Sequence, residues 1–368
     1  MVKVKATGNS NYYSKELSYT IVVSKVTPTV TVASRTVTYN RSAQNLITSS
    51  GTNWGTLQFS LDETNWSASI PTATNVGTYQ VYYKVIGDSN INDIASTAIS
   101  PASKIEAKSV TADITLSYIT HVYTGEALTP TVTAKDGTAT IPSTEYTVSY
   151  SNNTNAGTAT VTLTDKTGGN YIVTGSTTFT ITKAEGRVDV LPINRAVTYT
   201  GEPQVLATAG SGTGTMYYSL QENPNYTTSI PSLTNAGTYT MLFYAAESNN
   251  YTQSAVGSIE VTISKADPSY TAPTANNRTY DTTSKALLNA GSTSHGTIQY
   301  SSNNSTWGDT IPSQTNVGTY TTYWKIIGDS NHNDKASASI TTTISPKIVN
   351  NPTITLSPSS YIYSGNAC

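Results

Sequence analysis

Two loops of the sequence carry alternating acidic and amide side chains at the spacing that a calcium-binding loop uses. They read Gly-Asp-Ser-Asn-Ile-Asn-Asp from position 87 and Gly-Asp-Ser-Asn-His-Asn-Asp from position 328. Side-chain oxygens two residues apart can turn into one loop and coordinate Ca²⁺. An EF-hand loop also needs a glycine at its sixth position and a distal glutamate, and both are missing, so ordinary Asx turns are the competing interpretation. The candidate ligands are Asp88, Asn90, Asn92, Asp329, Asn331 and Asn333.

An aromatic residue recurs at one position in three segments of the chain, as Trp66, Tyr226 and Trp307. An exposed aromatic ring can stack on a sugar ring, and the candidate partner is a host glycan or a surface protein. The alternative is a core or rim residue of a β-sandwich, where large aromatic side chains are expected. Trp54 and Trp324 have no such counterparts.

Other chemistry lacks a convergent set of residues. The histidines His121, His295 and His332 occupy non-equivalent positions, which predicts surface or loop residues and no histidine metal site. No nucleophile–base or carboxylate pair recurs, so the sequence predicts no catalytic residues, no cofactor and no enzyme. Lysines near amides and carboxylates could form isopeptide crosslinks, but nothing fixes a triad. The one cysteine, Cys368, excludes an internal disulfide framework.

The amino-acid composition favours a strand-rich fold. Charged residues are 11% of the 368, well below the roughly 25% of a typical soluble domain, and the net charge is −2. No concentrated basic patch is present for a nucleic acid, and no apolar run is long enough for membrane insertion. Threonine is abundant and tyrosine numbers 26, against 3 phenylalanines and 3 methionines. β-branched and aromatic residues favour strands, and the low net charge with many aromatics argues against disorder.

Three motifs repeat with one period. Thr-Asn-(Val/Ala)-Gly-Thr occurs four times, with its asparagine at spacings of 80, 80 and 81 residues. A tyrosine followed by a turn opens each unit, and an Ile-Ser/Thr-Lys type of segment closes it. Three independent motifs in register indicate tandem repeats of about 80 residues. The asparagines are Asn75, Asn155, Asn235 and Asn316, the tyrosines Tyr39, Tyr123, Tyr199, Tyr280 and Tyr363, and the lysines Lys25, Lys183, Lys265 and Lys347.

The motifs divide the chain into four whole repeats and two partial ones. Repeat 2 belongs to a second subtype that lacks the recurring Trp/Tyr position, and the last partial repeat matches the beginning of that subtype. The chain therefore reads as a window from a longer array. The predicted boundaries are 1–26 (end of a preceding repeat), 27–106 (repeat 1), 107–184 (repeat 2), 185–265 (repeat 3), 266–347 (repeat 4) and 348–368 (start of a further repeat).

Each repeat is predicted to be an immunoglobulin-like β-sandwich. Six or seven short strands fit into 80 residues with turn signals between them. The glycines of the Asn-(Val/Ala)-Gly turns are expected to have positive φ, and the tyrosines two residues later to pack inward. Short linkers favour a monomeric, extended and semi-rigid array. In repeat 3 the predicted strands are 188–191, 196–199, 204–208, 214–220, 238–245 and 258–263.

The stretch Tyr-Thr-Val-Ser-Tyr-Ser-Asn-Asn-Thr-Asn-Ala-Gly-Thr-Ala-Thr-Val (146–161), with Gly-Asn-Tyr (169–171) and the Tyr-Thr-Gly openings, resembles the tandem immunoglobulin-like repeats of large bacterial surface proteins, of the MBG or YDG type. The resemblance covers essentially the whole chain. It implies a non-catalytic structural or adhesive stalk segment, extracellular or at the bacterial cell surface. The open alternatives are a module that binds a glycan or a host protein, and a structural protein of a phage tail or particle.

Overall fold

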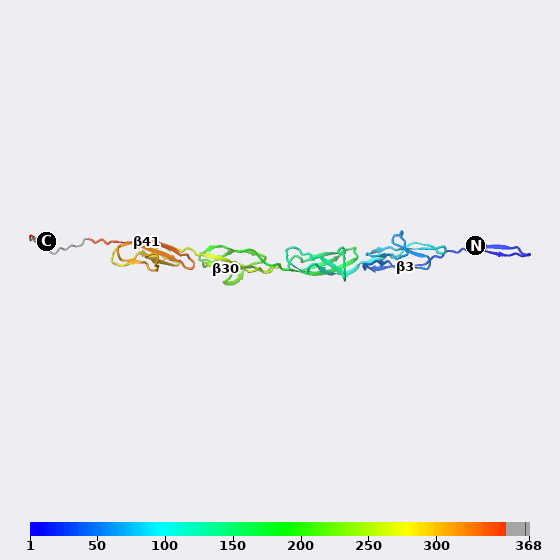
Figure 1. Cartoon of the computed structure of the whole chain (residues 1–368), viewed down its shortest axis with the longest axis horizontal. Helices are drawn as coiled ribbons and strands as arrows, with labels where there is room; N and C mark the ends of the chain where they lie inside the picture. The colour runs from blue at the N-terminus through cyan, green and yellow to red at the C-terminus, as the bar shows by residue number, and fades with distance from the viewer. Residues whose placement is uncertain (351–364, 366–368) are drawn as a thin grey trace. The chain divides into compact units, whose positions relative to one another are not determined.

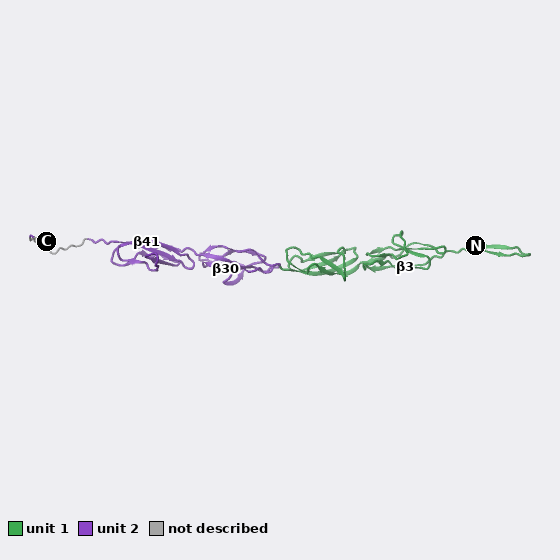
Figure 2. Ribbon diagram, in the orientation of Figure 1, with its two compact units in different colours: residues 1–183 green, residues 184–368 purple. Residues whose placement is uncertain are grey.

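The computed structural model describes residues 1–350 and 365, and within them the chain forms strands and no helix. The all-β prediction is therefore confirmed. The chain divides into two compact units, unit 1 (residues 1–183) and unit 2 (residues 184–368), which Figure 2 distinguishes by colour. Among the described residues there is no helix with the length and apolar character needed to cross a membrane. Of the last partial repeat, everything from residue 351 apart from Gly365 lies outside the described residues, including Tyr363 and Cys368.

Unit 1 begins with an antiparallel hairpin, in which Val2 lies opposite Tyr19. The side chains of both strands are exposed. The strands are β1 (Val2–Ala6) and β2 (Lys15–Tyr19).

Repeat 1 wraps two three-stranded sheets and two short ladders around one apolar core. One sheet has the order β11-β10-β7 and the other β4-β12-β9, and the ladders are β3-β6 and β5-β8. The core residues are Leu46, Ile47, Phe59, Val81, Ile99 and Ile105. The strands are β3 (Val30–Ser34), β4 (Thr36–Thr38), β5 (Gln44–Asn45), β6 (Ile47–Thr52), β7 (Thr56–Ser60), β8 (Thr72–Ala73), β9 (Gly77–Tyr79), β10 (Tyr82–Ile86), β11 (Ile94–Ala98) and β12 (Ser103–Glu106).

Repeat 2 packs a five-stranded sheet against a three-stranded one. The larger sheet runs β13-β20-β19-β18, with β15 also paired to β20, and the smaller runs β14-β16-β17. Buried residues alternate with exposed ones along β20, so that Phe179 and Ile181 enter the core while their neighbours face water. The strands are β13 (Lys108–Thr111), β14 (Asp113–Leu116), β15 (Thr120–Val122), β16 (Val132–Asp136), β17 (Ala139–Thr140), β18 (Tyr146–Ser151), β19 (Gly157–Asp165) and β20 (Tyr171–Thr182).

Repeat 3, the first of unit 2, has a five-stranded sheet in the order β23-β31-β30-β27-β28, with the ladders β21-β26, β22-β25 and β24-β29. The predicted strand 204–208 is split, because Leu206 is buried at 1% exposure and the chain changes ladder there. The strands are β21 (Val188–Val190), β22 (Ile193–Asn194), β23 (Val197–Thr198), β24 (Gln204–Val205), β25 (Ala207–Thr208), β26 (Ser211–Gly212), β27 (Met216–Leu220), β28 (Asn223–Thr227), β29 (Ser232–Leu233), β30 (Gly237–Ala245) and β31 (Gly257–Ser264).

Repeat 4 follows the same plan with a four-stranded sheet, β34-β41-β40-β38, and the ladders β32-β37, β33-β36 and β35-β39. Trp324 and Ile326 of β40 lie in its core. The strands are β32 (Tyr270–Thr271), β33 (Thr274–Ala275), β34 (Arg278–Thr279), β35 (Lys285–Ala286), β36 (Leu288–Asn289), β37 (Ser292–Thr293), β38 (Thr297–Ser301), β39 (Ser313–Gln314), β40 (Gly318–Ile327) and β41 (Lys335–Ser345). β3, β30 and β41 are labelled in Figure 1.

One topological feature recurs in all four repeats: a short strand near the start of the repeat pairs in parallel with the last strand. These pairs are β4 with β12, β15 with β20, β23 with β31, and β34 with β41. The pairing closes each sandwich, because it brings the beginning of the repeat to its end. In the described part of the chain every named ladder joins strands of the same repeat. The named ladders therefore do not join one repeat to the next, and contacts between repeats are made in other ways.

Candidate functional site

The Asn-(Val/Ala)-Gly turns are closed by the tyrosine that follows them. In repeat 3 the hydroxyl of Tyr239 donates to the carbonyl oxygen of Asn235 at 2.9 Å, and the tyrosine packs against the core as predicted. A Cβ atom on Gly237 would lie 3.1 Å from that hydroxyl oxygen, so the folded-back tyrosine favours glycine. The same hydrogen bond joins Tyr79 to Asn75 at 2.7 Å and Tyr320 to Asn316 at 2.9 Å.

The predicted positive φ holds for only part of these glycines. Gly157 has a φ of 141°, whereas the φ of Gly318, 158°, is almost extended. Gly77 and Gly237 do not have positive φ, so the prediction is wrong for them. Contact with the tyrosine ring, and not left-handed backbone, accounts for the glycine at position 237.

In unit 1 the turn of repeat 1 is the docking point for repeat 2. Asn170, just before β20, accepts a hydrogen bond at Oδ1 from the backbone N–H of Val76 at 2.8 Å. Its Nδ2 donates to Oδ1 of Asn75 at 3.4 Å. Asn170 is itself held by repeat 2, because its backbone N–H donates to the Glu145 carboxylate at 2.7 Å. One side-chain amide therefore both accepts from and donates to the preceding repeat.

In unit 2 the turn of repeat 3 receives repeat 4 in the same way. Oδ1 of Asn331 accepts from the backbone N–H of Ala236 at 2.8 Å, and its Nδ2 donates to Oδ1 of Asn235 at 3.3 Å. We call this set of contacts between successive repeats of one unit the junction. The asparagine of the repeated turn motif is thus a contact residue as well as a turn former.

An aromatic pair lies beside each of these asparagines. The rings of Tyr39 and Tyr171 meet edge to face with centroids 5.3 Å apart in unit 1. In unit 2 the corresponding pair is Tyr199 and His332, with centroids 5.2 Å apart and an interplanar angle of 81°. Such pairs add about 0.5–1.5 kcal/mol beyond the area that they bury. The tyrosines that open repeats 1 and 3 thus belong to the junction.

The junction of unit 1 also contains a charged cluster. Arg41 of repeat 1 pairs with Asp136 of repeat 2, which also binds Lys108. The Nε of Arg41 donates to the Tyr171 hydroxyl at 2.6 Å. The hydrogen bond from Lys108, assisted by Arg41, lowers the pKa of Asp136 below its usual value of 3.8. The hydrogen bond to Tyr171 is the main cause of the raised pKa of Arg41.

Two of the lysines that close a repeat, Lys25 and Lys265, bind a loop of the repeat that follows. Nζ of Lys25 donates to the carbonyl oxygen of Asp88 at 2.7 Å, and Nζ of Lys265 donates to that of Asp329 at 3.0 Å. The backbone of Val26 also exchanges hydrogen bonds with this loop, donating to Asn90 at 2.9 Å and accepting from Asn92 at 2.8 Å. Both a side chain and the backbone of this linker are therefore hydrogen-bonded to the loop.

The candidate calcium loops lie at these linkers. Asp88 accepts the backbone N–H of Asn90 at 2.7 Å, and Asp329 accepts that of Asn331 at 2.8 Å, which are Asx turns. Asn92 and Asn333 each donate from Nδ2 to the carbonyl oxygen of the closing lysine at 3.3 Å. The side-chain amides of Asn92, Asn331 and Asn333 are thus engaged with the preceding linker or repeat, while calcium binding by these loops stays a prediction.

The recurring aromatic residues are all partly buried. The ammonium group of Lys84 lies 4.4 Å from the ring centroid of Trp66, and that of Lys325 lies 4.5 Å from that of Trp307. Tyr226 instead packs edge-on against Tyr244 at 5.0 Å. A sugar could stack only on the indole face that the lysine leaves open. Glycan binding by these residues stays a prediction.

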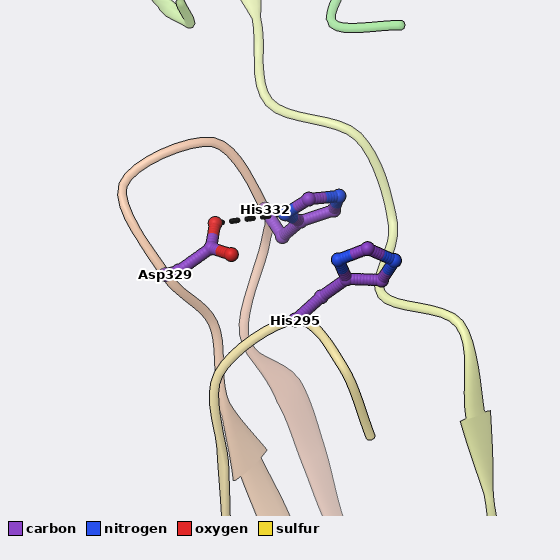
Figure 3. A group of neighbouring side chains, drawn as sticks. All are labelled: His295, Asp329 and His332. Atoms are coloured by element: carbon purple, nitrogen blue, oxygen red, sulfur yellow. Dashed lines mark hydrogen bonds and ion pairs between the residues drawn. The ribbon is translucent and has the colours of Figure 1, made fainter. Parts of the chain in front are cut away.

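The histidines do not match the expectation of separate surface residues. His121 is exposed, but His332 is only 6% exposed and its ring lies 4.0 Å from that of His295, centroid to centroid. Figure 3 shows this pair with Asp329. Both histidines belong to repeat 4, and alignment with repeat 1 places them at Trp54 and Ile91. Aligning the repeats in this way shows from the sequence alone that both histidines belong to one repeat.

The solved structures named below resemble this chain weakly. No family model matches the sequence, and no curated protein matches it either. Among solved structures, the chain is similar to domains 1–6 of the surface-layer protein SbsC, with 14% identity and a TM-score of 0.20 over 88% of this chain. It is also similar to the human desmocollin-1 ectodomain, with 10% identity and a TM-score of 0.19 over 95% of this chain and 85% of that one. The chain spans 55% of the surface-layer structure.

Replacing Asn331 by alanine should loosen the junction of unit 2. Two hydrogen bonds are lost, each worth about 1 kcal/mol, so docking of repeat 4 on repeat 3 should weaken by about 1–2 kcal/mol. Spin labels at Glu222→Cys and Asp309→Cys, in a Cys368→Ser background, report the distance distribution across the junction. Asn331→Ala should broaden it, whereas Asn289→Ala, an exposed change within repeat 4, should not. An equally narrow distribution in Asn331→Ala would show that the amide does not hold the junction.

Acid should weaken the junction of unit 1. Because the pKa of Asp136 is depressed in the folded chain, its contribution to stability is complete above the usual carboxyl pKa and disappears as pH falls through the folded value. Thermal unfolding followed by circular dichroism between pH 6 and pH 2 should give a wild-type advantage over Asp136→Asn that shrinks toward the acid end. The exposed change Asp113→Asn is the control. A constant difference at every pH contradicts the assignment.

Proposed function

We propose that this chain is a non-catalytic structural or adhesive stalk segment of a large bacterial surface or secreted protein. In this proposal the repeats are of the MBG or YDG type, the segment is extracellular, and its monomeric array carries distal domains away from the surface. Repetition of one module extends reach in proportion to the number of copies. The chain has no catalytic role in this proposal.

The observation that carries the proposal is that the same junction is built twice. Asn170 and Asn331 make equivalent paired hydrogen bonds to the turn of the repeat before them. A flexible tether would need no such contacts, because polar linkers between domains leave them free to move. Side chains that fasten repeats 2 and 4 to the repeats before them are what a load-bearing or spacing element requires.

The linkers support the same function. Only one residue, Ala107, separates β12 from β13, and a few separate the last strand of repeat 3 from the first of repeat 4. The lysine and asparagine contacts around Lys265 further restrict the second of these linkers. Few backbone torsions are therefore left to act as a hinge.

Small-angle X-ray scattering on the whole chain tests the stalk proposal. The wild type should scatter as an extended particle, and the double variant Asn170→Ala/Asn331→Ala should show a shorter maximum dimension and the signature of inter-repeat flexibility. Asn289→Ala is the matched control, because it removes an amide that bonds only within repeat 4. A compact profile for the wild-type chain would contradict the proposal.

A glycan-binding module is the second candidate, favoured by the partly exposed Trp66 and Trp307 with a lysine on one face. Copies of a weak site on different repeats of one chain would gain affinity by multivalency. A glycan array should then show binding that falls at least about tenfold in Trp66→Ala/Trp307→Ala. Lys84 and Lys325 are kept in that variant so that charge is unchanged. If the wild-type chain binds no glycan on the array, the glycan-binding function is contradicted and only the stalk proposal remains.

A further inference from the structure

Two loops of repeat 4 bring together two imidazoles and a carboxylate. His295 lies between β37 and β38, and Asp329 and His332 lie in the loop between β40 and β41 (Figure 3). Nδ1 of His332 is 2.7 Å from Oδ1 of Asp329. The metal-binding atoms of the three side chains all lie within 4.8 Å of one another. No other group of this kind occurs among residues 1–350 and 365.

We propose that His295, Asp329 and His332 form a binding site for a divalent transition-metal ion, with Zn²⁺ as the ion that fits best. Imidazole nitrogens and a carboxylate oxygen are the donors that zinc uses, with bond lengths of about 2.0–2.2 Å. Calcium is less suited to this set, because it takes six to eight oxygen ligands. The site is independent of the stalk proposal. It shares Asp329 with the predicted calcium loop and differs from that loop in its other two ligands.

Backbone packing positions the pair of loops. Gly296 has a φ of 114°, and a Cβ atom there would lie 2.0 Å from the carbonyl oxygen of Ile327 at the end of β40. The loop that carries His295 can therefore lie directly against the loop that carries Asp329 and His332. The imidazole of His332 is nearly buried, with 7% of the side chain exposed, whereas the Asp329 side chain is 40% exposed.

Only a small movement separates this arrangement from a ligand set. Three ligands around one tetrahedral ion lie about 3.4 Å apart, given zinc–ligand bonds near 2.0–2.2 Å. The two rings are nearly parallel, at 21°, so both cannot direct a lone pair at one ion as they stand. His295 is partly exposed and can rotate, while His332 is fixed by Asp329 on one side and by Tyr199 on the other.

The Asp329 carboxylate is already oriented in a way that suits a metal ligand. Its Oδ1 accepts the backbone N–H of Asn331 at 2.8 Å, which fixes the orientation of the group. The ammonium group of Lys265 bonds to the main-chain oxygen of Asp329 and not to the carboxylate. Bound metal would take the place of the hydrogen bond between His332 and Asp329. Because the His332 ring contacts Tyr199 of repeat 3, the ion would also stiffen the junction.

The other repeats supply natural comparisons. Repeat 1 has Trp54 and Ile91 where repeat 4 has the two histidines, although it keeps the aspartate as Asp88. The His332 position is tyrosine in the other two repeats, Tyr171 and Tyr251. His332→Tyr should therefore preserve the fold and the aromatic contact with Tyr199 while removing a ligand.

Isothermal titration calorimetry with ZnCl₂ tests the site, using the whole chain without an affinity tag and with Cys368→Ser to remove the only thiol. One ion should bind per chain, and CaCl₂ should not compete. His332→Tyr and His295→Trp should each lower zinc affinity at least about tenfold. His121→Ala, at an exposed histidine in unit 1, should leave it unchanged.

Visible absorption of the Co²⁺-loaded chain provides a second measurement, because the ligand-field bands report nitrogen ligation and low coordination number. These bands should be present in the wild type and lost in both variants. Circular dichroism checks that each variant is folded, and His295→Ala replaces any variant that is not. Absence of zinc binding, or binding that survives both histidine substitutions, overturns the proposal.

Discussion

Each junction depends on the side-chain amide of one asparagine, because that group both accepts from and donates to the preceding repeat. Asn170 and Asn331 need a backbone N–H that no strand uses, and the turn supplies it at Val76 and Ala236. Strand pairing does not hold this turn. Instead, the hydroxyl of Tyr79 or Tyr239 fixes its shape by a hydrogen bond to the asparagine carbonyl oxygen. The asparagine must also be held in the right position. The carboxylates of Glu145 and Asp329 do this by accepting the backbone N–H of Asn170 and Asn331, respectively. Four recurring features thus serve one contact.

The sequence predicted the all-β fold and the long strands, but not the use of the repeated motifs. β30 and β31 lie within a residue of the predicted segments, because five or more residues of alternating burial give a clear pattern. Ladders of two residues, such as β24 with β29, leave no such pattern. The docking role of Asn75 was missed because its partner is 95 residues away in another repeat. A motif within one module does not reveal what the next module places against it.

The histidine cluster illustrates how repeats diverge. Positions inside each sandwich must remain apolar to fill the core, whereas the loop positions equivalent to His295 hold tryptophan, threonine or histidine. Such a position can change without altering a sheet. When two neighbouring loop positions both become histidine beside an aspartate, the repeat acquires donors that its relatives lack. A consensus of the repeats hides these two histidines, which become visible only when the individual repeats are compared with one another.

The two junctions share an amide contact but differ in what surrounds it. In unit 1 it is accompanied by Arg41, Asp136 and Lys108, whose attraction is screened by salt and reduced by acid. In unit 2 the neighbouring groups are the Tyr199 ring and the His332 imidazole, which salt screens little. Neutral hydrogen bonds and an edge-to-face aromatic pair therefore provide the part of the junction that is common to both units. The surrounding residues determine which solution condition each junction responds to, so a stalk built from these repeats need not stiffen or loosen uniformly along its length.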